Sequence, residues 1–151
     1  MLVFRKKSGN FAKIEIMLAN KTRYAVLALI YLAGEYGKGP IQSSVIAANE
    51  KIPQRFLEVL LADMKGIGFL GSKPGKGGGY FLIKEPSQIS LFDIIDFSEG
   101  TLSWVPCVSE KSYQSCEFCK DEDLCKVRKV YSELREHNRN VLKNTSLKDL
   151  L

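Results

Sequence analysis

The sequence is short of the residues on which most enzymes depend. Its 151 residues include one histidine, His137, so no hydrolytic triad can be assembled, and no carboxylate pair stands out as an acid and a base. His137 is expected to be an ordinary surface or interface residue. We therefore predict that the protein is not an enzyme.

Long apolar runs are also missing. The most apolar stretch, residues 24–33, is much shorter than the ~20 residues that a membrane-spanning helix needs, and it predicts a buried helix instead. Residues 1–16 are basic but lack the apolar core of a secretory signal. We interpret them as a disordered extension or a misassigned start before Met17, with a DNA-binding arm as the alternative. We expect a cytoplasmic protein with no membrane partner.

The net charge of +5 hides an uneven distribution. Residues 18–84 carry nine Lys or Arg against four Asp or Glu, whereas residues 85–125 carry two against nine. A basic segment attracts phosphates, and an acidic one is kept away from them. The first segment is therefore expected to meet nucleic acid, and the second to serve another purpose.

The basic segment has the pattern of a helix-turn-helix. A helical repeat begins at Thr22, a plausible N-cap, and ends at Gly34. A short helix over 45–50, capped by Ser43 or Ser44, precedes a second one over 54–65, which has Pro53 at its first helical position. The apolar stripe of this second helix consists of Leu57, Leu60, Leu61 and Met64, and Gly66 and Gly68 should end it.

Two short strands, over residues 69–73 and 79–83, should follow as a β-hairpin. The glycine-rich run between them, which ends in Gly77-Gly78-Gly79-Tyr80, fits a hairpin tip that needs positive φ. A nucleotide loop is disfavoured because no Lys-Ser or Lys-Thr follows and the run enters a strand rather than a helix. The predicted fold is thus mostly α with a small β-wing: a winged helix over residues 17–84.

The remainder should hold a connecting helix and a long final helix. Ser90 and Asp93 predict a capping box for a helix over 91–98 that Gly100 closes. The final helix should begin near residues 121–123 and end near 143, and Thr145 or Ser146 should cap a last short turn. Five of its residues form a seam with heptad spacing: Val127, Tyr131, Leu134, Asn138 and Val141. Such a seam predicts a homodimer, with an intramolecular core stripe as the alternative.

All four cysteines lie between residues 107 and 125, in the spacing Cys107-x8-Cys116-x2-Cys119-x5-Cys125. In a reducing cytosol, such clusters more often bind metal or sense redox state than form disulfides. The single Cys-x-x-Cys knuckle and the uneven spacing favour an iron–sulfur cluster over zinc. Metal-free redox thiols and a merely structural role are the alternatives. Cys125 is expected in the first turn of the final helix, where the helix dipole favours a thiolate.

In the order of its predicted elements and in its motifs, the chain resembles the Rrf2 superfamily of bacterial winged-helix regulators. The resemblance rests on Lys-Thr-Arg-Tyr-Ala at residues 21–25, on the glycine-rich wing, and on Pro106-Cys107 followed by Cys119-x5-Cys125. It implies a transcription factor with three cysteine ligands, here Cys107, Cys119 and Cys125, and a variable fourth. Cys116 is an extra thiol that becomes the obvious fourth ligand, and Arg128 stands where some members have a histidine ligand.

We therefore expect a homodimeric DNA-binding regulator, most simply a repressor, controlled by a [2Fe–2S] or [4Fe–4S] cluster or by thiol redox state. It would have a DNA-binding domain (17–84), a connecting helix and cysteine loop (85–120) and a dimerisation helix with a tail (121–151). The alternatives are a cluster-free regulator that responds to a metabolite or partner protein, and a small iron–sulfur electron carrier.

The predicted partner is a double-stranded DNA operator. Near the start of the recognition helix, Gln54, Arg55 and Glu58 should reach base edges, with arginine on guanine and glutamate on cytosine. The alternative for Glu58 is a solvated carboxylate. Basic residues before the first helix and on the wing should contact phosphates. The full predicted set is Lys21, Arg23, Ser43, Gln54, Arg55, Glu58, Lys73, Lys76, Gly77 and Gly78.

Overall fold

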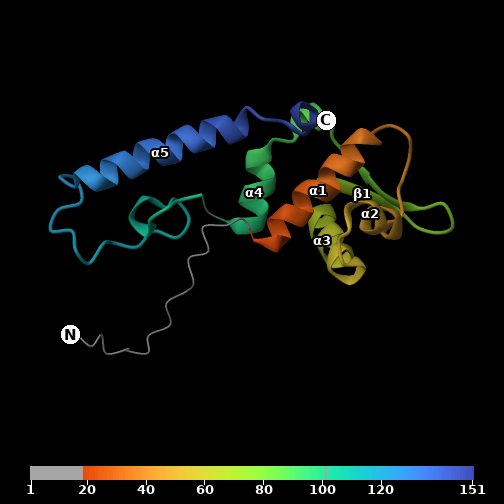
Figure 1. Ribbon diagram of the computed structural model, residues 1–151, viewed down its shortest axis with the longest axis horizontal. Coiled ribbons are helices and arrows are strands. Elements are labelled where there is room, and N and C mark those ends of the chain that lie inside the picture. Colours follow the sequence, from red (N-terminus) through yellow and green to blue (C-terminus); the bar gives the residue numbers. More distant parts are fainter. Residues whose placement is uncertain (1–18, 101) are drawn as a thin grey trace, which may run out of the picture.

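The computed structural model describes residues 19–100 and 102–151, and most of them lie in helices (Figure 1). The α-helices are α1 (Asn20–Gly34), α2 (Ser43–Glu50), α3 (Gln54–Gly66), α4 (Leu91–Glu99) and α5 (Lys126–Lys143). The strands are β1 (Leu70–Lys73) and β2 (Gly79–Leu82), and three short 3-10 turns are η1 (Pro86–Gln88), η2 (Pro106–Val108) and η3 (Leu147–Leu150). The predicted fold class, mostly α with a small β-wing, is confirmed.

The helix-turn-helix forms around the predicted apolar stripe of α3. All four stripe residues are buried, and they join buried residues of α1 and α2 in one core. Pro53 takes the N-cap position rather than the first helical position, because its ψ of 119° is extended. Likewise α2 begins at Ser43, one step earlier than a serine cap would place it, with Gln42 as its N-cap.

The wing is an antiparallel pair in which Leu70 lies opposite Leu82 and Lys73 opposite Gly79. Two of its glycines are required by close packing. A Cβ on Gly78 would lie 2.1 Å from the carbonyl oxygen of Lys73, and one on Gly79 would lie 2.1 Å from that of Ile41. At Gly79 the chain also has a φ of +146° and forms a bridge from Tyr80 to Ile41, which ties the wing to the segment before α2. Only glycine allows this approach.

The start of α1 differs from the prediction. Thr22 is not the N-cap, because α1 already begins at Asn20 and the side chain of Thr22 is fully buried. Its hydroxyl donates to the carboxylate of Glu99 at the end of α4, and the same carboxylate accepts the backbone N–H of Ala19 at 2.8 Å. Glu99 therefore supplies, from the end of α4, the acceptor that a local cap would provide.

The predicted capping box of α4 is confirmed, since Ser90 and Asp93 exchange hydrogen bonds and Gly100 ends the helix in the left-handed conformation. The predicted start of the last helix is wrong by several residues. Asp121 accepts the backbone N–H groups of Asp123 and Leu124 in a turn, and α5 begins only at Lys126.

After α5 the chain returns to the winged helix, as the position of the C-terminus beside α1 and α4 shows (Figure 1). Ser146 and Asp149 form the capping box of η3, which confirms the expected last turn. The sequence did not predict the burial of Leu147, which is 0% exposed and belongs to the main core. The N–H of Leu147 donates to the carbonyl of Ile89 at 2.9 Å. No helix in the described part of the chain is long and apolar enough to cross a membrane.

Candidate functional site

Three residues of the predicted DNA-binding set, Ser43, Gln54 and Glu58, form one hydrogen-bonded group beside the start of α3. The amide of Gln54 donates to the carboxylate of Glu58 at 3.1 Å, and the hydroxyl of Ser43 in α2 donates to the same oxygen at 3.4 Å. Gln54, Arg55 and Glu58 are all exposed. The carboxylate of Glu58 is therefore exposed and accepts hydrogen bonds from two neighbouring side chains.

The other predicted DNA-binding residues divide by their surroundings. Four of them are exposed: Arg23, Lys73, Lys76 and Gly77. Lys21 is half-buried and forms an ion pair on the surface of the domain, 3.7 Å from the carboxylate of Asp63 and above the ring of Phe97 at 4.9 Å. Gly78 is buried, and its N–H donates to the carbonyl of Gly75, so it shapes the wing tip.

The four cysteines line a single cavity of about 450 Å³. Cys107 lies on η2, Cys116 and Cys119 lie in the loop after it, and Cys125 is the N-cap of α5. The walls between them are largely apolar and include Val105, Phe118, Val127 and Tyr131. We call this space the thiol cavity.

Two of the thiols influence each other directly. A hydrogen bond with Cys125, followed by burial, raises the pKa of Cys119 to about 11. The pKa of Cys125 is lowered, chiefly because the backbone N–H of Arg128 donates to its sulfur at 3.4 Å, then because Cys119 donates to it. A thiolate at a helix N-terminus is the expected result of this geometry. Cys125 is thus the thiol best suited to carry negative charge.

Sulfur donors that share one cavity match the chemistry of an iron–sulfur or zinc site. Within residues 19–100 and 102–151, however, no group of three or more Cys, His, Asp or Glu side chains is close enough together to hold a metal ion. The two observations differ because lining a common cavity is a looser condition than meeting at one point. The donor set fits a cluster, whereas the arrangement is not a preformed metal centre.

The α5 seam is open along most of its length. Val127, Leu134 and Val141 are exposed to 63%, 37% and 52%, whereas Tyr131 and Asn138 are half-buried and Tyr131 lines the thiol cavity. The predicted seam left out two further members of the outer face, Val130 and His137, both of which are exposed; His137 is the surface or interface residue that was expected. The five exposed residues follow a three-four spacing: Val127, Val130, Leu134, His137 and Val141. The predicted seam also has alternating steps of three and four residues, so both sets match the spacing of a coiled-coil face; the exposed set differs from it only at the second and fourth members, each shifted by one residue.

A second group missed by sequence reasoning is a set of arginines on the inner face of α5. The Arg128 side chain donates to the carbonyl of Cys107 at 3.2 Å, and that of Arg135 donates to the carbonyl of Val108 at 2.5 Å. The signal for them was the spacing of Arg128, Arg135 and Arg139, which places all three on nearly one side of a helix.

A winged helix joined to a long exposed helix is an arrangement typical of a transcriptional regulator. The comparisons agree. The family model described as "Rrf2: Iron-dependent Transcriptional regulator" matches residues 18–151, so the chain belongs to the Rrf2 family. It is a transcriptional regulator of a family that is not enzymatic, which confirms that prediction.

Three individual proteins show how similar the chain is to other regulators. An rrf2-like HTH-type transcriptional regulator of Rhodobacter capsulatus is 34% identical over 138 residues, which cover 89% of this chain and 92% of that protein. The structure of CymR, the global cysteine regulator of B. subtilis, superposes with a TM-score of 0.74 at 30% identity, over 89% of this chain and 95% of the other. That of T. potens IscR gives 0.69 at 25% identity, over 90% and 86%.

Proposed function

We propose that the protein is a cytoplasmic, homodimeric repressor that binds an operator through its winged helix and is controlled through the thiol cavity. The observation that carries the proposal is the gathering of all four cysteines around one cavity at the start of α5, in a chain of the Rrf2 family. Thiolates are the groups through which both cluster loading and thiol oxidation act. Dimerisation is supported by the exposed apolar face of α5.

On DNA, α3 would enter the major groove with its N-terminal residues toward the bases. Arg55 is exposed and free to place its planar fork on guanine, while Glu58 is already directed by Gln54 and Ser43. Lys73 and Lys76 on the wing, together with Arg23, would meet phosphates. Lys21 would first have to leave Asp63 to do so.

The thiol cavity would hold a cluster through Cys107, Cys119 and Cys125, with Cys116 as the fourth thiol. Bound there, an iron–sulfur cluster supplies a group that oxidants and nitric oxide can change. The chain supplies the rest: the N–H groups at the start of α5 stabilise the Cys125 thiolate, and largely apolar residues line the space that the four cysteines share. Cys116 is the exposed thiol of the four.

The test begins with anaerobic purification, followed by visible absorbance and by iron and sulfide assays. Single changes to alanine at Cys107, Cys119 and Cys125 should each abolish cluster loading while circular dichroism remains unchanged. Cys116→Ala distinguishes a four-cysteine site, which would lose the cluster, from one with another fourth ligand, which would keep it. Retention of full iron and sulfide in any two of the first three variants would contradict the ligand set.

A cluster-free regulator is the second candidate, and one observation favours it. The described residues have no preformed metal group, and the Cys119 thiol already interacts with Cys125. Control would then come from thiol oxidation, a metabolite or a partner protein. A colourless anaerobic preparation that binds its operator would support this candidate. The third candidate, a small electron carrier, does not explain the winged helix. It would be favoured only if the protein did not bind DNA specifically.

A further inference from the structure

The segment that carries Cys107 has little structure of its own. Apart from the single turn of η2, residues 102–125 contain no helix or strand, and Cys107 lies 18 positions before Cys125. Bringing two thiols together across such a loop costs conformational entropy. The loop has a few hydrogen bonds of its own, such as that from the hydroxyl of Tyr113 to the carboxylate of Glu122 at 2.6 Å, and contacts from α5 add to them beside Cys107.

Side chains of α5 provide these added contacts. The Arg128 guanidinium donates to the backbone carbonyl of Cys107 itself, and it lies 3.8 Å from the carboxylates of both Glu122 and Asp123. Arg128 thus contacts the loop at two places, at Cys107 and at residues 122–123. Because the backbone N–H of the same residue also donates to the Cys125 sulfur, Arg128 contacts the segments of two cysteines at once.

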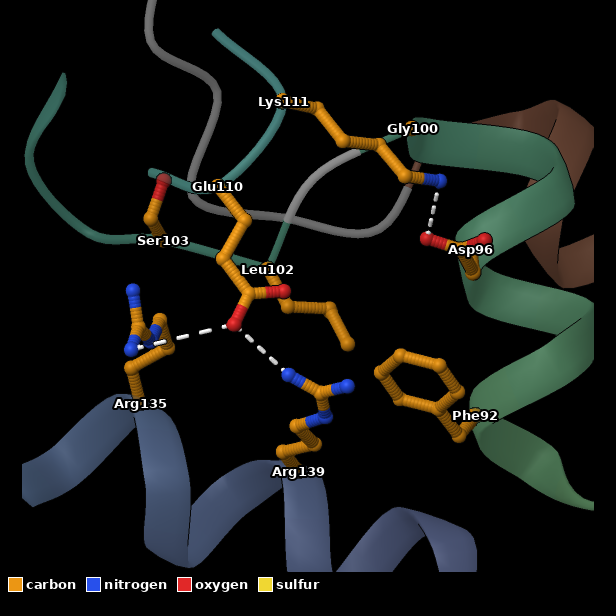
Figure 2. Close-up of a pocket in the computed structure, with 9 residues that line it drawn as sticks. All are labelled: Phe92, Asp96, Gly100, Leu102, Ser103, Glu110, Lys111, Arg135 and Arg139. Atoms are coloured by element: carbon orange, nitrogen blue, oxygen red, sulfur yellow. Dashed lines mark hydrogen bonds and ion pairs between the residues drawn. The ribbon is translucent and has the colours of Figure 1, made fainter. Parts of the chain in front are cut away.

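Arg135 and Arg139 continue the contact along the helix, as Figure 2 shows. Arg135 donates to the carbonyl of Val108, and the Glu110 carboxylate lies 3.8 Å from Arg135 and 2.6 Å from Arg139. The adjacent Lys111 reaches across to Asp96 of α4 at 2.5 Å. The cavity between these groups measures only about 40 Å³, so the side chains largely fill the space that they enclose.

These contacts are of the kind that positions a ligand. Hydrogen bonds from a charged donor are stronger than neutral ones, and the Arg128 and Arg135 side chains are only 32% and 23% exposed, so water competes less for them. Both arginines donate hydrogen bonds to backbone carbonyls, which holds the chain at residues 107 and 108 without using the Cys107 sulfur. Cys107 itself lines the thiol cavity, and the hydrogen bond from Arg128 uses its carbonyl oxygen rather than its sulfur.

We propose that Arg128 and Arg135 are positioning residues that hold Cys107 at the thiol cavity, so that its sulfur can act together with those of Cys119 and Cys125. The inference rests on the proposed function, because it gives the arginines a role only if the thiols act together. It assigns them no bond to the metal or cluster itself.

The experiment uses Co²⁺ as a probe on the full chain, reduced and free of metal, since Co²⁺–thiolate absorption reports bonding to sulfur. In wild-type protein the titration should show one thiolate-bound Co²⁺. Arg128→Met, which keeps the aliphatic stem, should weaken Co²⁺ binding by about 10-fold, the lower end of the usual effect of losing an orienting partner. Lys129→Met is the matched control, because Lys129 is the exposed neighbour on the same helix, and it should leave the affinity unchanged.

Thermal unfolding of the metal-free variants separates positioning from general damage to the fold. Arg128→Met should melt with the Lys129→Met control, and Arg135→Met provides a second test at the carbonyl of Val108 if Arg128→Met folds poorly. Equal affinity for Co²⁺ in Arg128→Met, Arg135→Met and wild type would overturn the inference.

A double-mutant cycle identifies Cys107 as the residue that is positioned. Cys107→Ala should itself weaken Co²⁺ binding, and adding Arg128→Met to it should have no further effect, since the sulfur that Arg128 positions is already gone. Fully additive losses would overturn the inference and leave the thiol site standing. If Cys107→Ala and Cys125→Ala both bind Co²⁺ like wild type, or wild type binds none, the thiol site of the proposed function fails, and the inference fails with it.

Discussion

Leu147 gives the sharpest test of how α5 is joined to the winged helix. The side chain is 0% exposed in the main core, although it lies four residues from the end of the chain. Burial of a leucine side chain is worth roughly 1.5–3 kcal/mol, and the cavity left by truncation adds to the loss. Leu147→Ala should therefore lower the free energy of unfolding by about 2–5 kcal/mol. For a chain of this length each kcal/mol lowers the melting temperature by about 2–4 °C.

Urea unfolding followed by circular dichroism measures this loss, at one fixed protein concentration because a dimer's stability depends on it. Leu150→Ala is the matched control, since Leu150 belongs to the same 3-10 turn but is 37% exposed. It should cost far less than Leu147→Ala. Identical urea midpoints for the two variants would show that η3 adds nothing to the core, and the reasoning about the anchor would be refuted.

Four other substitutions test the interface, the DNA contacts and the last turn. Leu134→Asp should convert the dimer to monomer in sedimentation, because pairing α5 would bury an unpaired carboxylate at a cost of several kcal/mol; a stable dimer would place the interface elsewhere. In competition titrations at two salt concentrations, Lys76→Ala should weaken specific and random DNA alike, whereas Arg55→Ala should cost ~1–3 kcal/mol on the operator and relax preference at one base pair. An equal effect of Arg55→Ala on both DNAs would make it a backbone contact. Hydrogen bonds from Ser146 lower the pKa of Asp149, so the carboxylate stabilises the fold above its unfolded-state pKa and this stabilisation is lost as the pH falls. Asp149→Asn should remove that part of the acid dependence in urea titrations, and an unchanged dependence would contradict it.

The elements that the sequence predicted well are those set by neighbouring residues. The stripe of α3, the strands of the wing and the capping box at Ser90 each depend on periodicity or on partners a few positions apart. The errors at Thr22 and at the start of α5 have different causes. Thr22 has the chemistry of a cap but turns inward to Glu99, 77 residues away, and no local pattern contains that partner. The acidic run at 121–123 resembles a first helical turn, but the side chain of Asp121 accepts the backbone N–H groups of Asp123 and Leu124 in a tight turn instead.

The candidate site could be predicted only as a set of residue types. The cysteine spacing indicated shared chemistry, and the structure brings all four thiols to one cavity. The spacing could not reveal how they are brought there, because Arg128 and Arg135 act on carbonyl groups, which every residue has. Lys21 is a similar case: its charge predicts a phosphate contact, and no pattern in the sequence indicated its contacts with Asp63 and Phe97.

The anchoring of η3 has a consequence for the operator. In a dimer built on α5, each winged helix is fixed to the C-terminal end of its own helix, so the distance between the two reading heads depends on where the helices cross. A shift of the pairing by one heptad moves the crossing by about 10.5 Å along the axis. That distance equals about three base pairs of B-DNA. The choice between neighbouring registers of α5, made by residues that never approach DNA, would therefore set the spacing of the half-sites that the protein accepts.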